Sequence, residues 1–178
     1  MERKTVILVV ASKGYQPVEY QETKKVLEAG GVDVITASDR PGMAIASNNT
    51  TTQATLDLNN IIPDRYDGLF FIGGPGAMDH LDDEISYKLI KKAADAGILY
   101  GAICIAPRIL AKTGVLQGKH ATGWDGDNKL DSVFDECGVL KKPLDVVVDG
   151  NIVTATGPAA AKDFGQAILK LLQEQPEE

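Results

Sequence analysis

The stretch Leu99-Tyr100-Gly101-Ala102-Ile103-Cys104-Ile105-Ala106-Pro107 decides the fold. Its apolar start is long enough for one buried strand, and Pro107 presets the backbone angle of a first helical turn. Residues 108–112 can continue that helix and Gly114 can end it, so Cys104 is predicted to lie on a sharp turn from strand to helix. This is the geometry of the nucleophile elbow of α/β enzymes. The alternative interpretation is a buried cysteine that acts only as a small hydrophobic residue.

Cysteine usage predicts a protein whose thiols are free. Cys104 and Cys137 alone do not make a disulfide framework, which indicates a reducing, cytoplasmic location. Amide donors and the partial positive charge at a helix start favour a thiolate, so we expect the pKa of Cys104 to lie below the ordinary value of about 8.5. No helix start follows Cys137, and we expect that residue to be structural and inert.

The bulk composition is that of one ordinary domain, which we expect to span residues 1–178. Hydrophobic residues make up 44% of the chain, enough for a full core, and the net charge is −7. No basic cluster indicates a surface for nucleic acid or for an anionic membrane, so neither is an expected partner. The longest apolar runs are far shorter than a membrane span, and residues 5–10 fit a first buried strand better than a signal peptide.

Strands and helices are predicted to alternate along the chain. Expected strands cover residues 6–10, 32–37, 68–72, 99–103 and 118–123, and expected helices cover 17–29, 82–96, 107–112 and an apolar-faced segment around 164–172. Alternation of this kind implies an α/β fold with one mostly parallel sheet and helices on both of its faces. Asp149-Gly150 between two β-rich runs adds a hairpin near the C-terminus.

Two parts of this prediction are more detailed. Helix 82–96 is expected to point four residues inward, namely Ile85, Leu89, Ile90 and Ala93. Residues 39–60 are less regular, because alternation around Met43 and Ile45 indicates an edge ribbon while residues 47–52 are typical of a polar loop.

Glu19 stands out in the first predicted helix. It lies four residues before Thr23 and seven before Val26, so it belongs to the stripe that faces the sheet. A carboxylate aimed inward is costly unless something binds it. The alternative is a first-turn acid that stays in water and favours the helix dipole.

A glycine-rich loop, Gly73-Gly74-Pro75-Gly76, follows the strand at 68–72 directly. Glycines there allow the backbone to approach a ligand closely, although the same loop could serve only as a tight turn. It is neither a P-loop nor a dinucleotide fingerprint, because the required residues and spacing are absent. Ligands of parallel sheets bind at the carboxyl ends of strands, and this loop, Glu19 and Cys104 each follow a strand. Their convergence favours the reactive-cysteine interpretation.

With these residues in hand, the chain resembles the ThiJ/PfpI superfamily. The resemblance covers almost the whole chain and rests on Glu19, Gly73-Gly74, Ala102-x-Cys104-x-x-Pro107 and the hairpin ending in Thr156-Gly157-Pro158. It implies a three-layer flavodoxin-like sandwich and a homodimer or larger oligomer. It also implies that Cys104 is the nucleophile, that Glu19 is a protonated acid bonded to it, and that the amides of Gly74 and Ile105 form an oxyanion hole.

The chain departs from the family pattern where a catalytic histidine is expected. The peptidase branch places a histidine directly after its cysteine, and this chain has Ile105 there. The deglycase branch has a histidine in the loop after the next strand, where this chain has Trp124, which suits a pocket wall. His120 lies a few residues early, and Asp125 is the other possible third member of the site. No residue pattern indicates a metal site.

The leading interpretation is a cofactor-free cysteine enzyme acting on small reactive dicarbonyls such as methylglyoxal, in a glyoxalase or deglycase reaction. Cys104 would add to the aldehyde, Glu19 would move the proton, and the loop amides would hold the oxyanion. A non-enzymatic redox sensor or stress chaperone that uses oxidation of Cys104 needs the same pocket and stays open. A PfpI-like peptidase or amidase is the third interpretation, and Ile105 argues against it.

Overall fold

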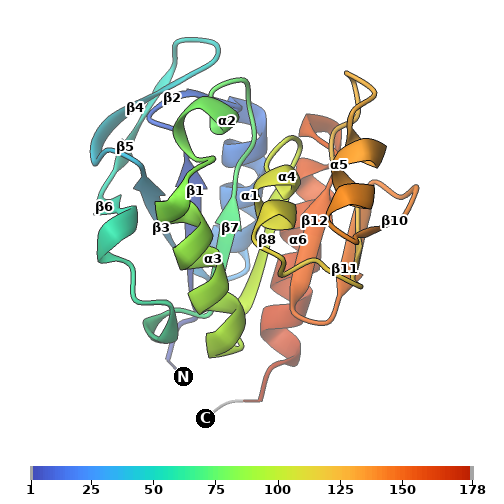
Figure 1. The fold of residues 1–178 in the computed structure, drawn as a ribbon. Coiled ribbons are helices and arrows are strands. Elements are labelled where there is room, and N and C mark those ends of the chain that lie inside the picture. The colour runs from blue at the N-terminus through green and yellow to red at the C-terminus, as the bar shows by residue number, and fades with distance from the viewer. Residues whose placement is uncertain (1, 177–178) are drawn as a thin grey trace.

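A seven-stranded sheet forms the middle layer of the computed structural model, which describes residues 2–176 (Figure 1). Its strands are β1 (Thr5–Val10), β3 (Asp33–Ser38), β6 (Leu56–Asp57), β7 (Gly68–Phe71), β8 (Leu99–Ile103), β11 (Val146–Asp149) and β12 (Ile152–Ala155). Their spatial order is β11-β12-β8-β7-β1-β3-β6, and every neighbouring pair is parallel except β11–β12. The predicted mostly parallel sheet with a C-terminal hairpin is therefore confirmed.

Helices cover both faces of this sheet, which gives the predicted three-layer sandwich. α1 (Pro17–Ala29) and α6 (Ala161–Glu174) pack against each other on the far face in Figure 1. The near face carries α2 (Ala77–His80), α3 (Glu84–Ala96), α4 (Pro107–Lys112) and α5 (Leu130–Glu136). Gly165 allows the close approach of α6 to α1, because a Cβ there would lie 3.0 Å from Cβ of Val26.

The core lies on both sides of β1, β7 and β8. Residues 6–10 are completely buried, as a continuous β-branched and leucine run predicts for a strand covered on both faces. On the α6 side Phe70 and Phe164 meet edge to face with ring centroids 5.8 Å apart. Because β1, β7 and β8 are parallel neighbours, the three loops that follow them meet at one edge of the sheet.

Small elements are where the sequence prediction is incomplete. A three-stranded ribbon joins β2 (Lys13–Tyr15), β4 (Gly42–Ala46) and β5 (Thr51–Ala54). Its middle strand, β4, is the edge ribbon predicted around Met43 and Ile45, whereas residues 51 and 52 of the expected loop belong to β5. β9 (His120–Ala121) pairs with β10 (Leu140–Lys141) as a separate two-stranded sheet. β2 and β10 are too short to show periodicity, and α2 and α5 have no side-chain N-cap to announce them.

One predicted inward residue of α3 is wrong. Ile85 is 42% exposed, and Ser86 is buried in its place beside Leu89, Ile90 and Ala93. Ser86, Leu89, Ile90 and Ala93 follow the spacing i, i+3, i+4 and i+7 of one helix face, which leaves Ile85 at the edge of that stripe.

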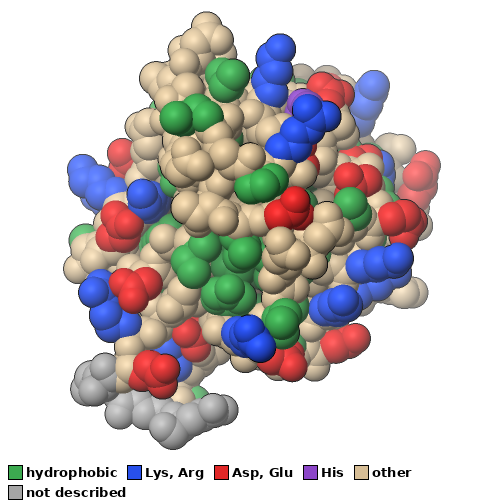
Figure 2. Space-filling model, turned by 90° about the vertical axis from the view of Figure 1, so that its left-hand side faces the viewer, with side chains coloured by type: hydrophobic (Ala, Val, Ile, Leu, Met, Phe, Trp, Pro, Cys, Tyr) green, Lys and Arg blue, Asp and Glu red, His purple; other side chains and the backbone are tan. Residues whose placement is uncertain are grey.

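The two ends of the described chain lie on the same side of the sandwich (Figure 1). β1 begins and α6 ends on the side opposite to the carboxyl ends of the parallel strands (Figure 1). Figure 2 looks onto the side that carries β4, β5 and β6, and hydrophobic side chains gather in the middle of it between charged ones. Met43 and Ile45 are large exposed hydrophobic residues on β4, and Ile62 is another in the segment after β6. Within residues 2–176 no helix is long and apolar enough to cross a membrane.

Candidate active site

Cys104 lies on the predicted elbow between β8 and α4, in a conformation that few residues adopt. Its φ is +66°, in the left-handed region, which costs a residue other than glycine about 1–3 kcal/mol. Two hydrogen bonds hold it there: its N–H donates to the carbonyl of Ala155 (2.9 Å), and its own carbonyl accepts from the amide of Trp124 (2.6 Å). The first turn of α4 follows at once from Pro107. The fold therefore maintains local strain at the cysteine, as nucleophile elbows do.

Glu19 points from the first turn of α1 into the protein and is completely buried. Its Oε1 accepts a hydrogen bond from the amide of Gly73 (2.9 Å), and its Oε2 is buried without a hydrogen-bond partner of standard geometry. The interaction of this carboxyl with the Cys104 thiol affects the pKa of both groups. The inward orientation expected from helix spacing is thus what the structure has, and the alternative of a wet surface acid is wrong.

Gly73 makes room for the carboxyl and the thiol to meet. A Cβ at this position would lie 2.6 Å from Cβ of Cys104 and 2.8 Å from Oε1 of Glu19. The neighbouring Gly74 has a φ of +114°, and a Cβ there would lie 2.4 Å from the backbone nitrogen of Gln16. Gln16 also fixes the start of α1, because its side chain accepts hydrogen bonds from the amides of Val18 and Glu19. Both glycines of the loop are therefore required by close backbone approach.

Burial governs the protonation of the pair. It raises the pKa of Glu19 from 4.5 to about 7, although the Gly73 amide and the Cys104 thiol lower it in part. Burial also raises the pKa of Cys104 from 9.0 to about 12; the charge of Glu19 and its hydrogen bond add to the rise, and the amides of Ile105 and Gly74 oppose it. The expected low thiol pKa is therefore wrong in direction, because desolvation and a neighbouring carboxyl outweigh the amides.

The two amides named for the oxyanion hole do converge on the sulfur. The N–H groups of Ile105 and Gly74 lie where they favour a negative charge on Sγ of Cys104. They come from two different loops, one after β8 and one after β7, so parallel strands bring them together at one sheet edge. A negative oxygen formed next to the sulfur would find the same donors.

Neither predicted third member is hydrogen-bonded to Cys104 or Glu19 in the described part of the chain. His120 pairs its Nδ1 with Asp149 (3.3 Å) at the hairpin turn, which strand register places level with Tyr100 rather than with Cys104. Four residues of strand separate those levels, about 13 Å. Asp125 accepts from the amide of Leu130 (3.0 Å) and from Lys141 (3.2 Å). The hydrogen bonds of both side chains thus go to residues outside the pair of Cys104 and Glu19.

Trp124 lies beside the elbow, and its neighbour Arg108 was missed by the sequence reasoning. The amide of Trp124 binds the Cys104 carbonyl, and its side chain is 37% exposed. Arg108 is only 6% exposed, binds Asp127 and lies over the Trp124 ring. An arginine in the first turn of the helix directly after the elbow, followed by a loop with two aspartates 16–19 residues further on, is the signal that could have identified it.

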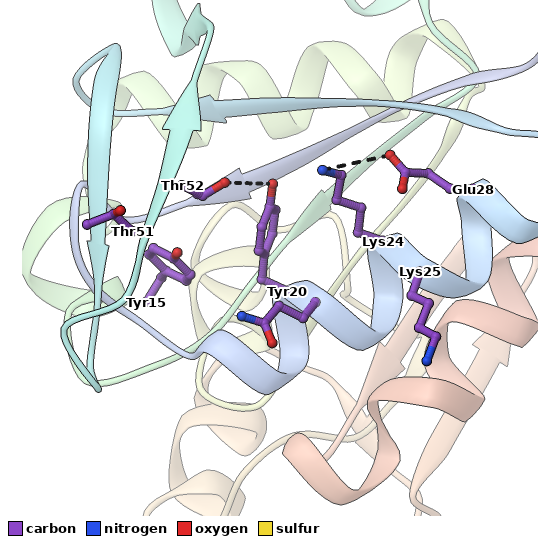
Figure 3. A pocket seen from close by; sticks show the side chains of 8 residues that line it. Tyr15, Tyr20, Lys24, Lys25, Glu28, Thr51 and Thr52 are labelled. Atoms are coloured by element: carbon purple, nitrogen blue, oxygen red, sulfur yellow. Dashed lines mark hydrogen bonds and ion pairs between the residues drawn. The ribbon is translucent and has the colours of Figure 1, made fainter.

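One surface hollow of the molecule is separate from the thiol. It measures about 320 Å³ and lies between α1 and β5, where Tyr15, Tyr20, Lys24 and Thr52 line it (Figure 3). The hydroxyl of Tyr20 bonds to Thr36 (2.6 Å) and Thr52 (3.2 Å), so this hydroxyl already has partners within the protein. Across the described part of the chain, no cluster of three or more His, Cys, Asp or Glu side chains is arranged to hold a metal ion.

These features define a class: a flavodoxin-like α/β protein whose strained elbow cysteine faces a buried glutamate. Within that class the chain belongs to the DJ-1/PfpI family, whose model matches residues 4–171. It is 30% identical to an uncharacterised protein of Methanocaldococcus jannaschii over 99% of this chain and 86% of that protein. It is 27% identical to a deglycase of Pyrococcus abyssi over 94% of this chain and 99% of the deglycase. A ThiJ/PfpI domain protein from Brachyspira murdochii superposes with a TM-score of 0.92 at 27% identity, covering 98% of this chain and 100% of that one.

Proposed function

We propose that the protein is a deglycase-like enzyme that acts on small reactive dicarbonyls such as methylglyoxal through Cys104. One observation carries the proposal: the strained Cys104 contacts the buried carboxyl of Glu19, whose pKa is raised, and the amides of Gly74 and Ile105 point at the same sulfur. The deglycase name of the Pyrococcus abyssi relative supports it, since that protein is similar along nearly its whole length. A free thiol nucleophile suits a reducing, cytoplasmic setting.

The proposed reaction begins at the aldehyde carbon. Sγ of Cys104 forms a bond to that carbon, and the carbonyl electron pair moves to the oxygen, which takes up a proton to give a hemithioacetal. The thiol proton passes to Glu19, whose pKa of about 7 allows it both to accept and to donate near neutral pH. Glu19 passes that proton to the new oxyanion and is ionised again. It then takes the proton from the former aldehyde carbon and returns it to the neighbouring carbonyl carbon, while the hydroxyl proton moves to the neighbouring oxygen. The product is a thioester, which water hydrolyses to the hydroxy acid and the free thiol.

The amides of Gly74 and Ile105 stabilise the negative charge in this scheme. They are backbone groups of two loops that are fixed by the sheet, so they need no reorganisation when an oxyanion forms. The low dielectric that raises both pKa values also strengthens these hydrogen bonds. The pocket therefore disfavours a thiolate on Cys104 in the free protein. It stabilises negative charge once that charge lies on the oxygen of a bound substrate.

Peptide hydrolysis fits this site less well. Amide cleavage needs a group that hands a proton to the amine leaving group. Ile105 and Trp124 stand where the family's histidines would do so, which leaves that task to Glu19, a group that already exchanges its proton with the thiol. Loss of a general acid–base group costs about 10²–10⁴-fold in rate. A thiol that adds to an aldehyde can tolerate this loss, because the aldehyde is a stronger electrophile and releases no amine.

Two assays on one preparation test the proposal. Methylglyoxal loss and peptide cleavage are measured side by side, each with Cys104→Ser, and Cys137→Ser serves as the matched control. We expect slow dicarbonyl turnover that Cys104→Ser abolishes and Cys137→Ser preserves, with no peptide cleavage above background. Cysteine-dependent proteolysis without dicarbonyl turnover would overturn the proposal.

A further inference from the structure

Arg108 is a buried cation one helical turn after the nucleophile. It lies on α4 with 6% of its surface exposed, and its guanidinium grips Asp127 with two hydrogen bonds, Nη1 to Oδ2 (2.9 Å) and Nη2 to Oδ1 (2.7 Å). Nη2 also donates to the carbonyl of Trp124 (2.9 Å), and the guanidinium lies 5.5 Å from the Trp124 ring centroid. Arg108 thus contacts both ends of the loop from residue 124 to residue 127.

The same loop is bound to the elbow from its other side. The amide of Trp124 donates to the carbonyl of Cys104 at 2.6 Å. Gly123 packs closely there, since a Cβ at this position would lie 3.2 Å from the Cys104 oxygen and 3.4 Å from Cβ of Pro107. Trp124 is therefore held at its amide by the strained cysteine and at its carbonyl by Arg108.

We propose that Arg108, bound to Asp127, is a positioning residue that keeps the 123–127 loop seated on the elbow and so controls access to the Cys104 thiol. The proposal deepens the proposed function and rests on it for its catalytic meaning. Arg108 acts through Trp124 and touches neither the sulfur nor the substrate in this scheme. Where the family pattern has a histidine in this loop, the chain has a tryptophan clamped by an arginine.

The chemistry of the clamp explains why an arginine is needed. A planar guanidinium can bind a carboxylate with two parallel bonds and still donate to a carbonyl, whereas a lysine ammonium is a single point charge. Asp127 is the carboxylate free for this task, because Asp125 is engaged by Leu130 and Lys141. Arg108 also holds the pKa of Asp127 at about 2, so the pair stays charged throughout the neutral range.

The sole tryptophan of the chain makes the clamp measurable. The variants are Arg108→Lys and Asp127→Asn, which weaken the clamp from opposite sides, and Asp131→Asn is the control because it removes an exposed carboxylate that pairs only with Lys141. Acrylamide quenching of tryptophan fluorescence reports the position of Trp124. Mass-mapped iodoacetamide labelling reports access to Cys104, and labelling of Cys137 reports general loosening of the fold.

Both clamp variants should increase quenching of Trp124 and speed the labelling of Cys104 by roughly threefold or more, because thiol reactivity follows exposure. Labelling of Cys137 should stay unchanged, and Asp131→Asn should match the parent throughout. Methylglyoxal turnover should fall in the same two variants, opposite in direction to the gain in labelling.

The outcomes separate this proposal from the function it deepens. If the parent has no dicarbonyl turnover but both variants show the quenching and labelling changes, the proposed function fails and the clamp stands. Unchanged quenching and Cys104 labelling in both variants would overturn the clamp. Equal acceleration of Cys104 and Cys137 would also overturn it, because Arg108 would then only stabilise the fold as a whole.

Discussion

Glu19 illustrates how burial couples a single residue to the stability of the fold. Its pKa rises from 4.5 to about 7 on folding, so between these values the folded protein binds a proton that the unfolded chain has released. The free energy of unfolding must then decrease as pH rises through this window. The carboxyl is most compatible with the fold below pH 4.5 and least compatible above pH 7.

We therefore predict that Glu19→Gln becomes more stable relative to the parent as pH increases. From pH 5 to pH 8 the free energy of unfolding of the variant should increase, relative to that of the parent, by about 2 kcal/mol. Urea denaturation of both proteins at the two pH values measures this. Glu28→Gln, an exposed change on the same helix, should show no such trend. A constant difference for Glu19→Gln would show that the carboxyl is not desolvated.

Cys104 should show the corresponding behaviour in its reactivity. Because burial and Glu19 raise its pKa to about 12, the rate of iodoacetamide labelling should rise about tenfold per pH unit from pH 7 to pH 10 without a plateau. Glu19→Gln removes the charge that raises this pKa, so labelling of that variant at pH 8 should be faster. A plateau near pH 8 in the parent would instead support the low thiol pKa that the sequence alone suggested.

At the scale of residues, the sequence identified the groups whose roles follow from backbone geometry. Cys104 before a proline-led helix and Glu19 on an inward stripe could both be placed from spacing. The roles of His120, Asp125 and Arg108 could not, because each depends on a partner distant in the chain: Asp149, Lys141 and Asp127. The predicted direction of the Cys104 pKa shift was wrong for a related reason, because burial is a property of the folded chain that the sequence does not show directly.

The loop after β7 is the element that brings the two halves of the site together. Gly73→Ala should destabilise the protein by about 1–3 kcal/mol and abolish dicarbonyl turnover, because the new methyl group would lie against Cys104 and Glu19. Gly157→Ala is the matched control: its φ of 163° is extended backbone, and nothing lies within 4 Å of the added Cβ. Thermal unfolding and the methylglyoxal assay compare the two. Full activity in Gly73→Ala would mean that the loop moves freely.

At the scale of helices and strands, the length of an element largely determined whether it could be predicted from the sequence. α1 begins at Pro17 and ends at Ala29 as predicted, and the hairpin at Asp149-Gly150 is confirmed by the β11–β12 register. β2 and α2 have three and four residues, too few for any period to repeat. Their positions come from tertiary contacts instead, since β2 pairs with β4 across thirty residues of chain.

At the scale of the whole molecule, we expect the protein to be a homodimer or larger. Family resemblance suggests it, and the side shown in Figure 2 carries a group of exposed hydrophobic side chains between charged ones. Met43 and Ile45 on β4 are 61% and 39% exposed. Exposed apolar surface of this kind favours association. Light scattering at micromolar concentration should give at least twice the mass of the 19.0 kDa chain. A monomer at that concentration would contradict the expectation.

The start of β1 and the end of α6 determine where a tag or fusion partner would lie relative to the thiol. β1 begins and α6 ends on the side away from the elbow of Cys104 (Figure 1). A fusion partner or an affinity tag attached at either end would therefore extend away from the thiol. Tethering by a terminus to a bead or sensor surface should leave the elbow open to small aldehydes, so the labelling and turnover assays can be run on immobilised protein.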